Sequence, residues 1–151
     1  MCGILGLSVD VRNGKEICFE SKSKFKEHFN KSNSMLYHRG PDAHGSEFFF
    51  DRGVFLGHTR LAIQDLSPAG AQPMNSEDES LTITFNGEIY NFPKLKKELI
   101  DQGYKFFSNT DTEVILNLYI AYGVDLFAML DGIFAVAIFD KNKDQLIVAR
   151  D

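Results

Sequence analysis

Residues 133–139 constrain the fold of this 151-residue chain more than any other stretch. The run reads IFAVAIF, so its side chains are apolar at odd and even positions alike. Successive side chains of a strand point to opposite faces, and a strand of this kind must therefore be covered on both sides. We expect a layered structure in which helices lie outside packed sheets.

Apolar runs and period-two alternation predict further strands, and helical spacing of apolar residues predicts helices. Strands are expected over 3–9, 46–50, 54–58, 81–85 and 145–150, with hairpin turns at 51–53 and 140–144 and a turn at 12–15. Helices are expected over 22–36, from Asn91 to Gly103, from Thr110 to Tyr122 and over 124–130, whereas 67–80 is expected to form a loop.

Two of these helices carry recognisable details. Asn91 is predicted to be the N-cap of its helix, because Pro93 follows early in the first turn. In the next helix an apolar stripe is expected to face the core, formed by Val114, Ile115, Leu118, Tyr119 and Tyr122. The three phenylalanines at 48–50 are interpreted as core residues rather than as a ligand site.

Composition excludes several classes of function. The chain is 44% hydrophobic and 25% charged, which suits one globular domain. Its net charge is −5 with a pI near 5.3 and no basic stripe, so nucleic-acid binding is not predicted. We find no apolar run approaching a membrane span and no secretory signal, which predicts a cytoplasmic protein without a membrane partner. In a reducing cytosol Cys2 and Cys18 should stay unpaired, and Cys18 is interpreted as a small strand hydrophobe.

Cys2 follows the initiator methionine directly. If Met1 is removed, one residue carries both a thiol and a free α-amine, and an α-amine has an ordinary pKa of about 7.7–8.0. A neutral amine beside a thiol can serve as its general base. Position alone does not separate this reading from a chance cysteine.

Several polar residues fall at predicted strand ends and helix starts, where scaffolds present chemistry. They are Cys2, Arg60, Asn86, Gly87, Glu88 and Asp111. Two of them have an ordinary alternative: Arg60 could be a solvated or ion-paired side chain, and Asp111 is favourable at any helix N-terminus. The histidines at 38, 44 and 58 lack the acid and cysteine spacing of a metal site, so no metal is predicted.

The chain resembles the glutaminase domain of class II glutamine amidotransferases, and within that family the glutamine-hydrolysing asparagine synthetases. Six blocks carry the resemblance: Met1–Ile4, Tyr37–Asp42, Arg60–Ser67, Gln72–Met74, Phe85–Asn91 and Thr110–Glu113. The resemblance implies an α+β fold of the N-terminal nucleophile (Ntn) hydrolase type, a four-layer αββα sandwich with two mainly antiparallel sheets.

The resemblance also implies a role for each residue of a glutamine site. Cys2, freed by loss of Met1, would be the nucleophile, and the side-chain amide of Asn86 and the backbone N–H of Gly87 would form the oxyanion hole. Arg60 would bind the α-carboxylate of glutamine, while Glu88 and Asp111 would hold its α-ammonium group. Three further residues are implied: Leu61 and Ile63 would line the pocket, and Asn91 would support the oxyanion hole.

The resemblance spans 1–151, and Asp151 follows a strand without a terminating signal. We therefore expect a glutaminase domain cut before its C-terminal end and before a synthetase domain. No cofactor is expected here; ATP and Mg²⁺ would belong to the synthetase domain, which would receive the ammonia. Two alternatives stay open: another ammonia acceptor such as a sugar or other carboxylate, and a non-catalytic binding module, against which the presence of both Cys2 and Asn86 argues. A homodimer is also left open.

Overall fold

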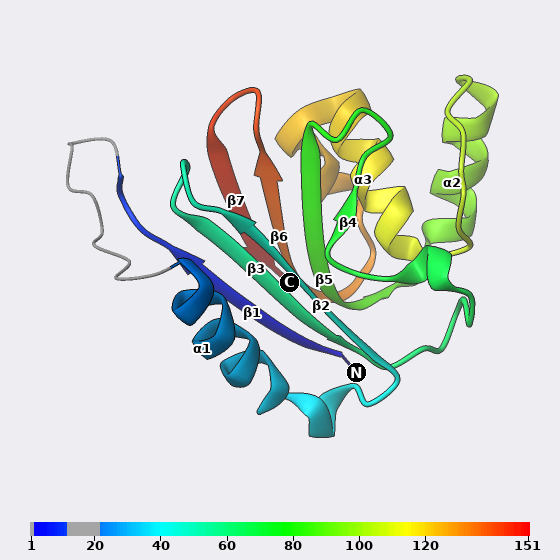
Figure 1. Ribbon diagram of the computed structural model, residues 1–151. Coiled ribbons are helices and arrows are strands. Elements are labelled where there is room, and N and C mark those ends of the chain that lie inside the picture. The colour runs from blue at the N-terminus through cyan, green and yellow to red at the C-terminus, as the bar shows by residue number, and fades with distance from the viewer. Residues whose placement is uncertain (1, 12–21) are drawn as a thin grey trace.

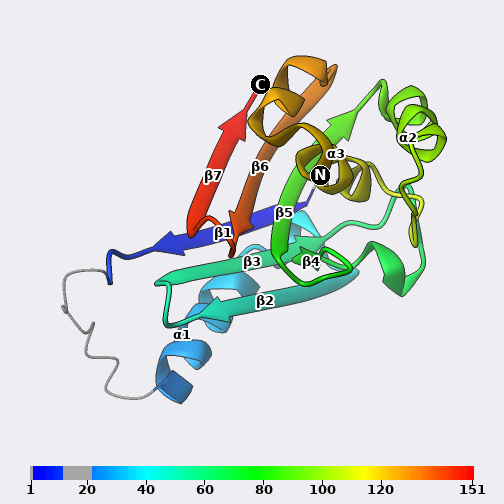
Figure 2. The same ribbon diagram turned by 90° about the horizontal axis from the view of Figure 1, so that it is seen from above.

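The computed structural model describes residues 2–11 and 22–151, and it has the layered α+β architecture expected from residues 133–139 (Figure 1). Two antiparallel sheets, ordered β1-β3-β2 and β4-β5-β6-β7, pack face to face. Helix α1 covers the outer face of the first sheet, and α2 and α3 cover the outer face of the second (Figures 1 and 2). The turn predicted at 12–15 and the strand role of Cys18 lie outside the described residues.

The first sheet is held to its helix by aromatic side chains. Its strands are β1 (Gly3–Ser8), β2 (Ala43–Phe49) and β3 (Val54–Arg60), and its helix is α1 (Lys22–Ser34). The ring centroids of Phe25 and Phe55 lie 4.5 Å apart, and those of Phe29 and Phe48 lie 5.3 Å apart. The phenylalanines at 48–50 are therefore packing residues, as predicted. A short 3-10 turn, η1 (Tyr37–Arg39), follows α1.

The second sheet contains β4 (Met74–Asn75), β5 (Leu81–Ile89), β6 (Gly132–Asp140) and β7 (Gln145–Arg150). The prediction that the strand at 81 ends before Asn86 is wrong. β5 continues to Ile89 because Asn86, Gly87 and Glu88 each pair with a residue of β6. The loop expected over 67–80 also contains a 3-10 turn, η2 (Pro68–Gly70), and the two-residue strand β4.

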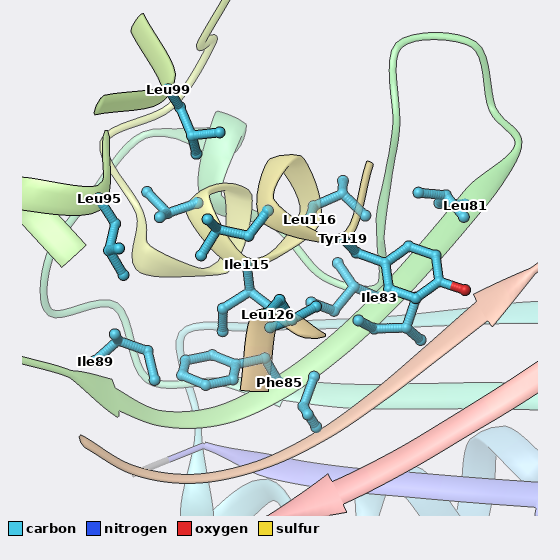
Figure 3. Packing of buried hydrophobic residues seen from close by; sticks show 14 residues of the cluster. Leu81, Ile83, Phe85, Ile89, Leu95, Leu99, Ile115, Leu116, Tyr119 and Leu126 are labelled. Atoms are coloured by element: carbon cyan, nitrogen blue, oxygen red, sulfur yellow. The ribbon is translucent and has the colours of Figure 1, made fainter. Parts of the chain in front are cut away.

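The outer helices of the second sheet build the larger core (Figure 3). They are α2 (Phe92–Asp101), α3 (Asp111–Tyr122) and the 3-10 segment η3 (Gly123–Met129). Thr110 caps α3 by accepting a hydrogen bond from the Glu113 N–H. The predicted stripe of α3 is buried from Val114 to Tyr119, whereas Tyr122 is 38% exposed because the helix ends there, before Gly123 at φ +59°.

One segment differs from the expectation that no stretch approaches a membrane span. Residues Asp111–Met129 form a helical stretch of 19 residues with a mean hydropathy of 1.3, long and apolar enough by these measures to cross a bilayer. In this fold Val114, Ile115 and Leu118 are buried in the core against β5. The apolar composition of the segment therefore matches a helix that packs on a sheet.

Between the two sheets lie a small cluster of apolar side chains and one buried histidine. Leu56, Ala137 and Phe139 pack between them, with the Phe49 ring centroid 4.9 Å from that of Phe139. On β3, His58 follows Leu56 by two residues and is fully buried. Apolar contact therefore gives way to polar contact toward one end of the sandwich, which is the end where the candidate site lies.

Candidate active site

A pocket of about 170 Å³ opens where β1 begins, β3 ends and α3 starts. Seven of the residues singled out from the sequence line it: Cys2, Arg60, Leu61, Ile63, Gly87, Glu88 and Asp111. They come from segments up to 109 positions apart, and the fold brings them together. The wall also contains four residues that no pattern in the sequence singled out individually: Gln64, Asp65, Gln72 and Thr112.

The pairing of β1 with β3 sets the position of Cys2. Gly3 pairs with Thr59, so Cys2 stands at the strand end beside Leu61. The Leu61 N–H donates to the Cys2 Sγ over 3.3 Å, and the Sγ lies 3.7 Å from the Leu61 carbonyl oxygen. A Cβ at position 3 would come within 2.5 Å of the Thr59 Oγ1, so the residue after the cysteine must be small. The thiol is therefore held at a rigid strand end on the pocket wall.

The turn at residues 37–42 supports this corner of the pocket, although its sequence alone is equally typical of a surface loop. Arg39 donates from Nε to the Cys2 carbonyl oxygen over 3.4 Å. Asp42 accepts the Ala62 N–H at Oδ2 over 2.8 Å. One short motif thus contacts both the backbone of Cys2 and the segment that follows Arg60.

Backbone N–H groups of β5 form a row along the edge that faces away from β6. Pairing with β4 occupies this edge at Ile83. The Phe85 N–H donates to the Gln72 Oε1 over 2.6 Å, and the Ile89 N–H donates to the Asp111 Oδ2 over 3.1 Å. Backbone groups alternate in direction along an antiparallel strand, so the N–H of Gly87 points toward the same edge. Between these two side-chain partners Gly87 lines the pocket.

Asn86 precedes this glycine and is half-buried. Its Oδ1 is buried and has no hydrogen-bond partner among the described residues. Alternation along β5 directs its side chain to the face that Thr84 uses to contact Gly57 of the first sheet. The amide therefore lies on the face of β5 that looks toward the sheet carrying Cys2.

Asn91 lies outside the residues that line the pocket. It occupies the N-cap position of α2, as predicted, although its side chain makes no capping hydrogen bond. Its Nδ2 donates to the Met129 carbonyl oxygen over 2.9 Å, and its Oδ1 accepts the Asp131 N–H over 3.1 Å. These bonds use the amide to join α2 to the turn before β6.

Arg60 is a buried cation at the end of β3, with only 8% of its surface exposed. Its guanidinium group donates to the backbone carbonyl oxygens of Asp65 and Ser67, the latter over 2.9 Å. A Cβ at Gly70 would come within 2.3 Å of the Arg60 Nη2, so the loop closes tightly on the guanidinium group. None of the described carboxylates lies within ion-pair distance of it. The charge of Asp65 acts on Arg60 from beyond ion-pair distance, and the guanidinium group itself is held by backbone carbonyl oxygens, an arrangement that leaves it able to pair with an anionic ligand.

Asp111 and Glu88 supply negative charge to the same pocket. Burial raises the pKa of Asp111 to about 6; the Glu88 charge adds to this rise, while hydrogen bonds from the backbone N–H groups of Ile89, Thr112 and Asp111 oppose it. A cationic ligand group beside these carboxylates would favour their charged forms. The pocket thus combines an unpaired guanidinium group with two acids, which is complementary to the charges of a free amino acid.

The loop after Arg60 is tied to the start of α3. Asp65 accepts the Asn109 N–H at Oδ2 and the Ser67 N–H at Oδ1, each over 2.8 Å. Hydrogen bonds from Ser67 and Asn109 lower the pKa of Asp65 to about 2. Gln64 accepts the Asp111 N–H over 3.2 Å. The pocket is therefore closed on this side by a loop held in one position.

These features define a two-sheet αββα sandwich with a pocket that contains a cysteine and charged groups of both signs. Residues 1–151 match the family model described as "Glutamine amidotransferase domain". The chain belongs to this family, and its fold is that of the Ntn-hydrolase amidotransferases.

Individual relatives agree with this assignment. The whole chain is 40% identical to asparagine synthetase [glutamine-hydrolyzing] 1 of Bacillus subtilis and 38% identical to "Amidase chry2" of Gibberella zeae, covering 22% of each. Among solved structures, glutamine phosphoribosylpyrophosphate amidotransferase from B. subtilis matches with a TM-score of 0.54 and 28% identity, over 66% of this chain and 23% of that one. The chain thus spans less than a quarter of the length of these proteins.

Proposed function

We propose that the chain hydrolyses glutamine to glutamate and ammonia, with Cys2 as the nucleophile. The observation that carries the proposal is the position of the Cys2 thiol in one pocket with Gly87, an unpaired Arg60 and two carboxylates. Removal of Met1 would free the α-amine of Cys2. That amine then takes the thiol proton and acts as the general base.

The thiolate attacks the side-chain amide carbon of glutamine, and negative charge develops on the amide oxygen. The Asn86 side-chain amide and the Gly87 N–H donate hydrogen bonds to this oxygen. One such donor typically contributes about 10²–10³ in rate. The protonated amine then gives its proton to the departing ammonia, which leaves a γ-glutamyl thioester on Cys2. Water hydrolyses the thioester and releases glutamate.

Substrate selection rests on the charges of the pocket. Arg60 pairs with the α-carboxylate of glutamine through its planar fork, and Glu88 and Asp111 accept hydrogen bonds from the α-ammonium group. Leu61 and Ile63 form the walls along the side chain. An amide without the zwitterion leaves Arg60 buried and unpaired, and the pocket therefore discriminates against it.

In the longer protein the ammonia would pass to a C-terminal synthetase domain that activates aspartate with ATP and Mg²⁺. The support is the similarity to proteins named glutamine-hydrolysing asparagine synthetases, of which the chain covers 22–30%. An ammonia acceptor other than aspartate, such as a sugar carboxylate, is the second candidate. One observation favours it: the chain matches a protein named an amidase over an equal length. The residues of the pocket serve both acceptors equally, because ammonia is released before either is used.

The test is ammonia release from glutamine by the purified chain, with removal of Met1 verified by intact mass. Wild type should release ammonia, and Cys2→Ala should lose at least about 10³ of the rate. Cys18→Ala is the matched control, because it removes the only other thiol of the chain. Turnover that survives in Cys2→Ala would refute the mechanism. Binding of glutamine by the mature wild type without ammonia release would instead identify a binding module.

A further inference from the structure

Two buried side chains hold the backbone of β5 immediately before Asn86. Gln72 accepts the Phe85 N–H at Oε1 over 2.6 Å. His58 Nε2 lies 3.2 Å from the Phe85 carbonyl oxygen. A carbonyl oxygen can only accept, so the Nε2 of His58 carries the hydrogen. Both peptide groups that flank Phe85 are therefore fixed by side chains from other parts of the chain.

The two side chains come from different layers. His58 is fully buried on β3 of the first sheet, and it reaches across the interface to β5. Gln72 is 9% exposed and lies ahead of β4, and its Nε2 donates to the Thr112 Oγ1 of α3 over 3.1 Å. The backbone at Phe85 is thus connected to the opposite sheet and to the helix that carries Asp111.

Stability alone explains this arrangement poorly. Burial lowers the pKa of His58 to about 4, so the ring is neutral at physiological pH. Its Nδ1 is buried and has no hydrogen-bond partner among the described residues. Burying an imidazole with one unsatisfied nitrogen is unfavourable, and an apolar side chain such as leucine would avoid that penalty. A histidine at this position can donate a hydrogen bond to the Phe85 carbonyl oxygen, whereas a leucine cannot.

We propose that His58 and Gln72 are positioning residues, which fix the Phe85 backbone and thereby aim the Asn86 amide and the Gly87 N–H at the reacting oxygen. The inference rests on the function proposed above for those two donors. It requires no contact between His58 or Gln72 and the glutamine side chain. β4 pairs with β5 only as far as Ile83, so the two side chains replace strand pairing at this point.

The consequence is a separation between turnover and binding. A misplacement of about 1 Å at a reacting group can lower the rate about 10²-fold. The zwitterion is held by Arg60, Glu88 and Asp111, which these two residues do not contact through any hydrogen bond in the described part of the chain. Loss of either positioning residue should therefore lower kcat and leave KM for glutamine nearly constant.

The experiment compares His58→Leu, which removes the donor, with His58→Gln, whose Nε2 reaches a similar position. His58→Leu should lower kcat about 10–100-fold with KM within about threefold, and His58→Gln should recover most of the lost kcat. Gln72→Met and Gln72→Glu form a second pair. Methionine removes the acceptor for the Phe85 N–H, glutamate keeps it, and the same pattern of kcat is expected.

Tyr119→Phe is the control for loss of a buried hydrogen bond. Its hydroxyl donates to the Asp140 Oδ2 over 3.0 Å at the opposite end of β6, so the change should lower the urea midpoint without lowering kcat. Circular dichroism verifies folding, and if His58→Leu fails to fold, Gln72→Met decides. A folded variant of either pair that lacks the contact yet keeps kcat within twofold of wild type overturns the inference. Cys2→Ala assayed in parallel separates the outcomes: turnover there refutes the proposed function itself.

Discussion

Asp111 should make the affinity for glutamine depend on pH between about 5 and 7, a range in which most carboxylates no longer titrate. In the empty pocket its pKa is raised from 3.8 to about 6, mainly by burial. The α-ammonium group of glutamine requires the ionised carboxylate, so binding must expel the proton whenever Asp111 is protonated. Above about pH 7 Asp111 is almost fully ionised, so no proton needs to leave and affinity should be constant.

The magnitude follows from this pKa. A group with a pKa of about 6 is about one-tenth ionised at pH 5, so the dissociation constant should be about tenfold larger at pH 5 than at pH 7. About half a proton should be released per glutamine bound at pH 6. Returning the pKa of Asp111 by two units to its ordinary value corresponds to about 3 kcal/mol of interaction with the ammonium group.

Calorimetry on Cys2→Ala measures this directly, because that variant binds without turnover and the α-amine does no chemistry in it. Titrations at pH 5, 6 and 7 in buffers of different ionisation enthalpy give both the affinity and the proton count. Asp111→Asn keeps an oxygen for the Ile89 N–H and should bind weakly with a flat profile. Equal affinity at pH 5 and pH 7, or an unchanged slope in Asp111→Asn, would refute the reasoning.

The same pKa has a consequence for folding with a definite sign. The folded state binds this proton more tightly than the unfolded state, so the stability due to Asp111 is present below about pH 4 and is lost as pH rises to about 6. Above about pH 7 the unfavourable contribution of Asp111 to stability is constant. Asp111→Asn should therefore raise the free energy of unfolding at pH 7, by at most about 3 kcal/mol. Urea denaturation at pH 4.5 and pH 7 should find a smaller gain at the lower pH.

Three further changes test other parts of the structure. Gly70→Ala places a Cβ against Arg60 and should raise KM for glutamine about tenfold in steady-state assays, with kcat within about threefold. Glu113→Gln weakens the bonds that its carboxylate accepts from the Ser108 N–H and hydroxyl over 2.7 and 2.6 Å, and should lower stability by about 1–3 kcal/mol in urea. Ile115→Ala opens a cavity in the core and should lower stability by about 2–5 kcal/mol in the same assay.

The layered arrangement of sheets and helices was predictable because it follows from patterns within single segments of the sequence. The two-sided apolar run at 133–139 required cover on both faces, and the helical stripe at 114–119 supplied one of those covers. The positions of Cys2, Arg60 and Asp111 at predicted strand ends and helix starts made them candidates, but only the whole motifs indicated a role for each. Their approach to one another depends on pairing between strands far apart in the chain, which periodicity does not encode.

Other features were out of reach for a related reason. β5 was expected to end before Asn86 because the alternation of apolar and polar residues covers only 81–85, but pairing with β6 continues to Ile89. Two hydrogen bonds, between Gln72 and Phe85 and between Arg39 and Cys2, join a side chain to a backbone group far away in the chain. No spacing of residues in the sequence predicts such bonds. Gln72 and Arg39 lie within two of the motifs, which was the only signal available for either residue.

The two-residue length of β4 has a consequence for the chemistry. If β4 began a few residues before Met74 in the same register, its carbonyl oxygens would accept the N–H groups of Phe85 and Gly87. The sheet would become more regular, and the donor needed by the reacting oxygen would be consumed as an ordinary ladder bond. In the proposed mechanism, the late start of this edge strand is therefore as necessary as the nucleophile, and a change that extended β4 before Met74 would inactivate the protein while making it more stable.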